Sequence, residues 1–262
     1  MKRLEGIGIL LTAKLETEIF DMVKIELKNI SFAYQIGHDS FVSVLHDLNL
    51  KAESGEIIGL IGKNGCGKTT LLNILKGKLI SEKGEIDIIN ENKTVIQRHY
   101  IPLVSQTVDS NLFPSLTVYE NFCIVKNKRN MLNFYNSKSL YKYCYDLLCS
   151  ANMNLEAKID EQVRFLSGGQ KQAISILLAL EYDYPILLMD EPTASLDPFV
   201  SENIIQLAKQ EISKRNGILF LVSHNLQDII KYTTKIFVLS NGQVKPLDNY
   251  EGLSETDLMK LM

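Results

Sequence analysis

Hydrophobic and polar residues alternate in the first part of the chain. The apolar members of this series are Val23, Ile25 and Leu27, followed after a one-residue slip by Ile30, Phe32 and Tyr34. A period of two predicts a β-strand with one buried face, and the slip predicts a β-bulge near Lys28–Asn29. The segment VLHDLNL (44–50) repeats the pattern and predicts a second strand, which ESGE (53–56) ends in a turn.

A different pattern begins at residue 57. The segment IIGLI (57–61) is a continuous apolar run, which is typical of a strand covered on both faces. The glycine-rich segment GKNGCGKTT (62–70) follows directly, and leucines then recur at helical spacing at Leu71, Leu75 and Leu79. A strand, a glycine-rich loop and an amphipathic helix stand in the order of a phosphate-binding P-loop.

The second half of the chain alternates between strand and helix patterns. Strand patterns cover PILLMD (185–190), GILFLVS (217–223) and KIFVLS (235–240), with helical patterns at 169–181 and 199–214. This alternation predicts an α/β core built on a parallel sheet. Residues 107–164 lose the strand pattern and predict a mostly helical insertion. One helix face there carries Leu140, Cys144 and Leu147–Leu148.

Composition excludes several classes of protein. The 28 basic and 31 acidic residues give a net charge of −3, which offers no bulk attraction to nucleic acid or an anionic membrane. No apolar run reaches the roughly 18–20 residues of a membrane-spanning helix. The apolar stretch Ile7–Leu11 is too short for a signal peptide. We therefore expect a cytoplasmic protein whose membrane role, if it has one, comes through partners.

The cysteines favour reduced thiols. They are Cys66, Cys123, Cys144 and Cys149. They form no C-x-x-C pair, which argues against a zinc or redox motif. Cys66 lies within the glycine-rich loop, where the simplest interpretation is a small residue that fits the turn. We still expect thiol reagents that modify Cys66 to block the site.

The glycine-rich segment matches G-x-x-x-x-G-K-[ST] at Gly62, Gly67, Lys68 and Thr69. Glycines at these positions free the backbone, so that successive N–H groups converge on phosphate oxygens at a helix N-terminus. We expect Lys68 to reach the β- and γ-phosphates and the Thr69 hydroxyl to bind Mg²⁺. The residues of this loop expected to bind the nucleotide are Gly62, Lys63, Asn64, Gly65, Cys66, Gly67, Lys68, Thr69 and Thr70.

Two acidic residues follow the strand pattern ILLM. The strand delivers Asp190 to its carboxyl end, where open α/β sheets bind ligands. We expect Asp190 to hold Mg²⁺. Glu191, one residue further on, is placed to polarise or deprotonate the attacking water.

The segment FLSGGQ (165–170) gives the most specific resemblance. Leu166–Gln170 matches the signature of the ATP-binding cassette (ABC) ATPases, and the chain resembles that family from about Met22 to about Leu247. Six motifs stand in the family's order: Walker A (62–70), Gln106, the signature (166–170), Walker B (186–191), SLD (195–197) and His224. The resemblance implies an α/β fold: a P-loop NTPase (RecA-like) core with an antiparallel β subdomain and a helical, family-specific subdomain.

The resemblance also implies a domain organisation. It covers one ABC ATPase domain over residues 22–247, with the helical subdomain inserted at about 107–164. Residues 1–21 then form an N-terminal extension, or translation starts at Met22, and residues 248–262 form a short C-terminal tail. We expect that deleting 1–21 leaves the ATPase activity intact.

The resemblance assigns roles by position. Tyr34 would stack its ring on adenine, with packing on the core as the alternative. Gln106 would sense the γ-phosphate, Mg²⁺ and the water, and His224 would orient Glu191 and hydrogen-bond the γ-phosphate. The resulting catalytic set is Glu191, His224, Gln106 and Lys68, and the metal ligands are Thr69, Gln106 and Asp190.

In this family two cassettes pair head to tail. Each ATP lies between the P-loop of one subunit and the signature of the other, so the partner is a second copy of the chain or another cassette. The residues implied to face the partner's nucleotide are Ser167, Gly168, Gly169, Gln170 and Asp197.

Hydrolysis must be coupled to other proteins. In transporters of the family, the region equivalent to NLFPSLTVYENF (111–122) forms part of a groove that receives a membrane subunit. Phe113, Leu116 and Tyr119 are candidates for that contact, and packing within the helical subdomain is the alternative.

Several members of the family do not fit the chain. Only 97 residues separate Lys68 from Leu166, which leaves no room for the long coiled coils of chromosome-structural relatives. Ribosome-acting relatives carry two cassettes, and this chain has one set of motifs. A soluble ATPase for protein or iron–sulfur cluster assembly is the non-transport alternative. The chain is similar to ATPases of bacterial tryptophan/tyrosine-type amino-acid or other small-solute importers, and this resemblance implies permease subunits and a solute-binding protein as partners.

Overall fold

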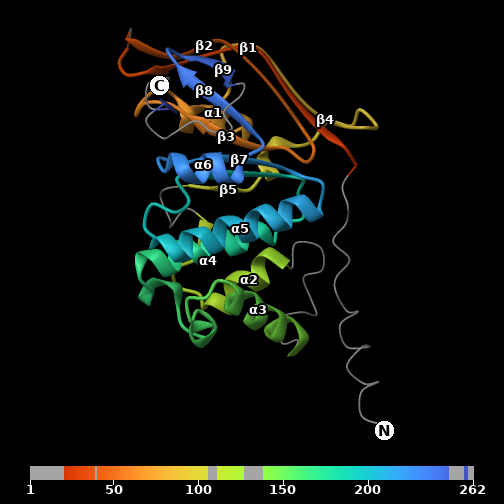
Figure 1. Cartoon of the computed structure of the whole chain (residues 1–262), viewed down its shortest axis with the longest axis vertical. Coiled ribbons are helices and arrows are strands. Elements are labelled where there is room, and N and C mark those ends of the chain that lie inside the picture. Colours follow the sequence, from red (N-terminus) through yellow and green to blue (C-terminus); the bar gives the residue numbers. More distant parts are fainter. Residues whose placement is uncertain (1–20, 39, 106–110, 127–137, 248–256, 259–262) are drawn as a thin grey trace.

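Two β-sheets organise the described part of the chain in the computed structural model, residues 21–38, 40–105, 111–126, 138–247 and 257–258 (Figure 1). The smaller sheet is antiparallel, in the order β2 (Phe41–Glu53), β1 (Val23–Gln35), β4 (Lys83–Asn90). The larger sheet has the order β5 (Leu103–Val104), β6 (Ile186–Asp190), β7 (Ile218–Val222), β3 (Ile57–Ile61), β8 (Lys235–Ser240), β9 (Gln243–Leu247). All neighbours in it are parallel except β9, which returns from β8 as a hairpin.

The helices lie on both sides of the larger sheet (Figure 1). They are α1 (Lys68–Leu75), α2 (Val118–Lys126), α3 (Lys138–Ser150), α4 (Gly168–Leu180), α5 (Pro198–Lys214) and α6 (Leu226–Tyr232). Short 3₁₀ helices cover Arg98–Tyr100, Glu156–Lys158 and Val163–Phe165. Helix α1 lies between the two sheets, α4, α5 and α6 cover the opposite face, and α2 and α3 extend the molecule beyond α4.

Alternate residues of the parallel strands divide the core into two clusters. Ile58 and Leu60 of β3 pack with α1 and the antiparallel sheet. Ile57 and Ile61 of the same strand pack with α4, α5 and α6. The predicted apolar run is therefore explained by burial on both faces. This architecture confirms the predicted α/β fold.

The helical part beyond α4 is attached to the core by polar contacts as well as by packing. Of the helix face predicted in α3, Leu140, Cys144 and Leu148 are buried, whereas Leu147 is half-buried. Glu181, the residue that ends α4, is buried and accepts a 2.8 Å hydrogen bond from the Tyr143 hydroxyl.

Lys126, the last residue of α2, forms an ion pair with the same carboxylate and lies 4.8 Å from the Tyr143 ring centre. The Arg215 guanidinium donates to the carbonyl oxygens of Leu180 and Tyr182 at 2.6 and 2.7 Å, which satisfies the C-terminal end of α4. Glu181, at the end of α4, therefore joins both α2 and α3 to the core.

Local geometry confirms one prediction, corrects another and adds a strand that was not predicted. The β1–β2 register shifts between Leu27 and Ile30, and Asn29 has a φ of 53°, so the bulge lies where the slip predicted it. The helix expected to include Leu79 ends at Leu75, because Gly77 turns the chain with a φ of 76°. Strand β4 was not predicted, although its pairing with β1 completes the antiparallel sheet.

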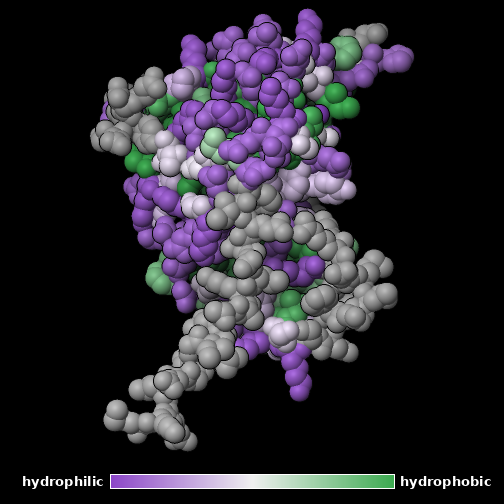
Figure 2. Space-filling view, turned by 90° about the vertical axis from the view of Figure 1, so that its right-hand side faces the viewer, coloured by the Kyte–Doolittle hydropathy of each residue, from purple (hydrophilic) through white to green (hydrophobic). Residues whose placement is uncertain are grey.

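None of the helices in the described residues has the length and apolar content needed to cross a bilayer. The face shown in Figure 2 is mostly hydrophilic, and its apolar side chains form small groups rather than a continuous band.

Candidate active site

The parallel strands bring three distant segments to one edge of the sheet. Val222 of β7 pairs with Leu60 of β3 on one side and with Asp190 of β6 on the other. The carboxyl ends of these strands are therefore level. The glycine-rich loop follows β3, Glu191 follows β6, and His224 lies two residues beyond β7. The sheet itself thus assembles the predicted site.

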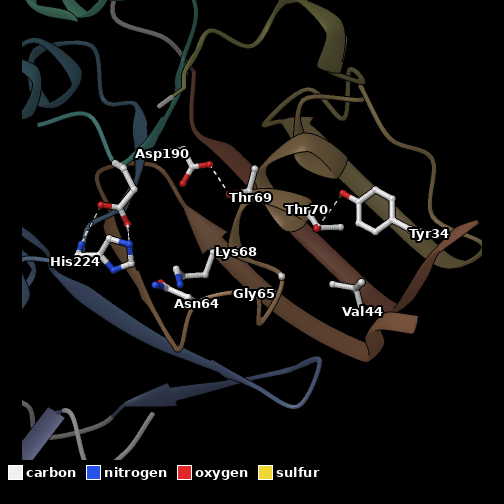
Figure 3. Close-up of a pocket in the computed structure, with 11 residues that line it drawn as sticks. Tyr34, Val44, Asn64, Gly65, Lys68, Thr69, Thr70, Asp190 and His224 are labelled. Carbon is white, nitrogen blue, oxygen red and sulfur yellow. Dashed lines mark hydrogen bonds and ion pairs between the residues drawn. The ribbon is translucent and has the colours of Figure 1, made fainter. Parts of the chain in front are cut away.

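A cavity of about 530 Å³ opens at this edge (Figure 3). Its lining comes from the loop and the start of α1, the ends of β6 and β7, and the antiparallel sheet. The lining residues are Tyr34, Val44, Asn64, Gly65, Gly67, Lys68, Thr69, Thr70, Asp190, Glu191 and His224. Val44 is the one member that the sequence analysis missed. It lies on β2 two residues from Val42, the cross-strand partner of Tyr34, so strand register could have found it.

The loop conformation requires glycine at two positions. Gly67, at the N-cap of α1, has a φ of 109°, and a β-carbon there would lie 2.8 Å from Val44. Gly62 has a φ of 156°, and its β-carbon would lie 2.3 Å from the carbonyl oxygen of Leu239. Larger residues are excluded by both backbone strain and contact distance. The loop therefore brings the N-terminus of α1 to the cavity.

Two polar side chains at the start of α1 are already positioned. Lys68 is buried, and its Nζ donates to the carbonyl oxygens of Gly62 and Lys63 at 2.7 and 3.0 Å. Thr69 Oγ1 donates a 2.6 Å hydrogen bond to Asp190 Oδ2. The two oxygens expected to bind Mg²⁺ thus lie side by side. This donor set fits Mg²⁺, which usually takes one or two protein oxygens and completes its octahedron with phosphates and waters.

Glu191 and His224 form a pair at the cavity. The Glu191 carboxylate accepts a 3.1 Å hydrogen bond from the backbone N–H of His224, and its other oxygen lies 3.1 Å from His224 Nε2. Burial raises the pKa of the Glu191 carboxyl above its usual value, and the nearby His224 opposes that shift. A carboxylate with a raised pKa is a stronger base than an exposed one. The geometry suits proton removal from water.

Tyr34 reaches the cavity from the antiparallel sheet. Its hydroxyl and the Thr70 hydroxyl are 3.1 Å apart, and its ring packs edge-on against Phe32 with 4.9 Å between ring centres. The side chain is nevertheless 39% exposed. Part of the side chain therefore remains accessible, and the adenine-stacking role stays a prediction.

The signature lies outside this cavity. Ser167 is the N-cap of α4, where its hydroxyl accepts from Gln170 N at 3.3 Å and Gln170 Oε1 accepts from Ser167 N at 3.1 Å. Ser167 and Gly168 are exposed. Asp197 caps α5 through Oδ1, which accepts from Phe199 N and Val200 N. The signature residues and Asp197 are thus not brought to the subunit's own P-loop.

Four other predicted residues have different outcomes. Gly62, Lys63 and Cys66 belong to the loop but do not line the cavity, and Cys66 Sγ lies 3.9 Å from Lys68 Nζ. Gln106 lies outside the described residues. Its proposed contact with the nucleotide and metal stays a prediction.

The segment expected to contact a membrane subunit is partly exposed. Phe113 is 53% exposed, and Leu116 and Tyr119 are half-buried. Asn121 holds the segment by accepting from Phe113 N at 2.8 Å and donating to the carbonyl oxygens of Phe113 and Thr117. Tyr119 packs against the main core, which agrees with the alternative of packing within the helical subdomain. The exposed side chain of Phe113 is accessible for a contact with a membrane subunit.

Residues 45–194 match the family model described as ABC transporter. The chain belongs to the ABC transporter family. This match spans the glycine-rich loop, the signature and the Asp190–Glu191 pair. The chain is therefore an ATP-binding subunit with the P-loop NTPase fold, and an ATPase.

Curated relatives carry similar names. The chain is 30% identical to the tyrosine transport ATP-binding protein of Clostridioides difficile, over 84% of this chain and 90% of that relative. It is 29% identical to a thiamine import ATP-binding protein of Photorhabdus laumondii, over 88% and 92%. It also matches a ribose import ATP-binding protein of Lactococcus lactis at 32% identity, but spans only 44% of that relative's length.

Solved structures agree on the architecture. The dimeric structure of the post-hydrolysis state of the ATP-binding cassette MJ0796, bound to ADP and Pi, matches with a TM-score of 0.72. It is 29% identical, with 84% of this chain and 96% of that chain covered. The two chains therefore share the cassette fold, and the dimer is that of MJ0796.

Proposed function

We propose that this ABC ATPase works as a head-to-tail dimer with a second copy of itself. Each ATP is held by Lys68, Thr69 and the loop of one subunit and by Ser167 and Gly168 of the other. The observation that carries this proposal is the exposed N-terminus of α4, which lies away from the subunit's own cavity. The dimeric cassette of similar fold supports it.

The side chains at the cavity divide the work of hydrolysis. Thr69 and Asp190 would hold Mg²⁺, which would neutralise charge at the phosphates. Glu191 takes a proton from the attacking water, and His224 keeps the carboxylate oriented. Lys68, now bonded to loop carbonyls, turns to the phosphates when ATP enters. Tyr34 packs on the base.

The ATPase drives import of a small solute by separate membrane subunits. The solute class proposed is an amino acid, which rests on the tyrosine transport relative that aligns over nearly its whole length. The exposed Phe113 and its neighbours provide the contact with the membrane subunits. The chain is thereby held on the cytoplasmic face of the cell membrane, with a solute-binding protein on the opposite side.

Co-purification from native membranes tests the coupling. The tagged chain, extracted in mild detergent, should carry integral-membrane proteins in a defined ratio. Proteoliposomes containing that complex should take up labelled tyrosine or another amino acid only when ATP is enclosed in the vesicle lumen, because an importer delivers its solute to the side on which the cassette lies. The Glu191→Gln complex should assemble equally but take up nothing. Recovery of soluble partners alone would favour the assembly ATPase and contradict transport.

A further inference from the structure

The signature helix α4 is bonded to the segment that follows Asp190. Gln172, in the second turn of α4, is only 2% exposed, and its Nε2 donates a 2.8 Å hydrogen bond to the carbonyl oxygen of Pro192. Pro192 is joined directly to Glu191. One side chain of α4 thus holds the peptide next to the carboxylate that is placed to activate water.

A second contact lies one turn nearer to the start of α4. A β-carbon at Gly169 would lie 3.0 Å from the carbonyl oxygen of Ser195, so glycine lets the helix approach this loop very closely. Gly169 and Gln172 are three positions apart and therefore share one helix face. That face of α4 contacts the loop at both ends of residues 192–195.

Glu191 depends on restraints of this kind. Its φ of 52° is left-handed, a conformation that residues with a side chain adopt rarely. Its backbone N–H donates to Val222 at 3.0 Å, and its carboxylate accepts from His224, so β7 and the residues after it hold one side. Gln172 holds the other side through Pro192. Strained backbone persists only where its surroundings restrain it.

We propose that Gln172 is a positioning residue for hydrolysis, which transmits the position of the signature helix to Glu191 of the same subunit. This rests on the proposed function, in which Ser167 at the start of α4 contacts the partner's nucleotide. When α4 moves toward that nucleotide, the bond to Pro192 moves the strained peptide at Glu191. Occupancy of one site thereby sets the geometry of the other.

The position of Gln172 predicts how its loss appears in kinetics. Gln172 does not line the cavity, so its removal should leave ATP binding in place. Gln172→Met keeps the length and the helix propensity but removes the donor. We expect kcat to fall about tenfold, because the net contribution of one hydrogen bond corresponds to about a tenfold change in rate. KM should stay within about twofold of the native value. The Hill coefficient for ATP should fall toward one.

The matched control is Ser175→Ala, since Ser175 lies on the same helix and is equally buried at 2%. It should keep kcat, KM and the Hill coefficient, and both variants should unfold within a few degrees of the native protein. An unchanged kcat in Gln172→Met, or an equal loss in both variants, would overturn the proposal.

Mixed dimers identify the subunit on which Gln172 acts. In a dimer of Gln172→Met with Glu191→Gln, the remaining active carboxylate belongs to the subunit that lacks the bond, so hydrolysis should fall about tenfold. When both changes lie in one subunit, the active carboxylate keeps its own Gln172, and hydrolysis should match a native/Glu191→Gln dimer. The reverse result would show that Gln172 serves the partner's site and would refute the proposed direction. Failure of Glu191→Gln to dimerise with ATP would instead contradict the proposed function.

Discussion

The cassette has two glycine-rich helix N-termini that satisfy their first turns in different ways. Helix α1 begins after Gly67, which has no side chain to cap the helix, and its residues Lys68 and Thr70 are buried beside the cavity. Helix α4 begins after Ser167, which forms a reciprocal capping box with Gln170 on the exposed surface.

This difference distinguishes a phosphate site used by the subunit itself, at α1, from one that faces another molecule, at α4. Both N-termini carry the partial positive charge of a helix dipole, so both favour anions. The first turn of α1 has the loop and Lys68 around it and needs no other chain. The first turn of α4 is stable on the surface because Ser167 and Gln170 satisfy each other's N–H groups. A similar sequence feature therefore serves two different tasks.

The largest expected effect separates chemistry from binding at the α1 site. Glu191→Gln removes the general base but keeps the side chain's size, so turnover should fall about 100-fold or more. ATP binding should persist, and a closed dimer should accumulate. Phosphate release measures turnover, and light scattering with and without Mg-ATP measures the dimer. Turnover within threefold of the native protein would show that Glu191 is not the base.

The next effect isolates the α4 site. Ser167→Arg places a bulky side chain where the partner's nucleotide should bind, while α1 is untouched. The isolated subunit should bind ATP normally, fail to dimerise in the Glu191→Gln background, and lose about 100-fold in hydrolysis. Ser150→Arg, an exposed serine at the end of α3, is the matched control and should behave as the native protein. Dimerisation of the Ser167 variant with ATP would contradict the assigned role of α4.

Thiol modification should also distinguish the N-terminus of α1 from that of α4, because Cys66 lies in the loop directly before α1. Cys66 is half-buried in the loop before α1, so a maleimide there should inactivate the ATPase in proportion to modification. Bound Mg-ATP should protect it. Cys66→Ala should be insensitive even though Cys149 remains partly accessible. Full activity after stoichiometric modification of Cys66 would show that this thiol does not lie close to the bound nucleotide.

The smallest expected effect lies at the base-binding end of the cavity. Tyr34→Ala removes a ring worth about 0.5–1.5 kcal/mol in stacking, so KM for ATP should rise about two- to tenfold with kcat little changed. Tyr34→Phe keeps the ring and loses only the contact with Thr70. A KM close to that of the native protein is expected. Equal defects in both variants would assign the role to the hydroxyl and not the ring.

The sequence predicts best the elements whose signal is local. The bounds of β3 and β8 coincide with the apolar runs at 57–61 and 235–240, because turn residues flank each run. The P-loop is equally local, since strand, loop and helix are contiguous. The capping box at Ser167 and Gln170 is also local, because its partners are three positions apart, but it was not predicted.

Features that depend on distant neighbours were not predictable. Strand β4 contains alternating Ile86 and Ile88, but its pairing with β1 joins residues about sixty positions apart. The bond from Gln172 to Pro192 spans twenty positions and has no periodic pattern. Leu79 illustrates the opposite error, because its helical spacing is real but Gly77 ends the helix first. Tertiary contacts decide these cases, and one sequence does not contain their geometry.

The level ends of β3, β6 and β7 make the site sensitive to the length of each strand. Val222 pairs with both neighbours, so the lengths of β6 and β7 determine where Glu191 and His224 lie relative to the loop. Deleting one residue from β7 would shift the register of the strand residues beyond the gap, so His224 would no longer be held opposite Glu191.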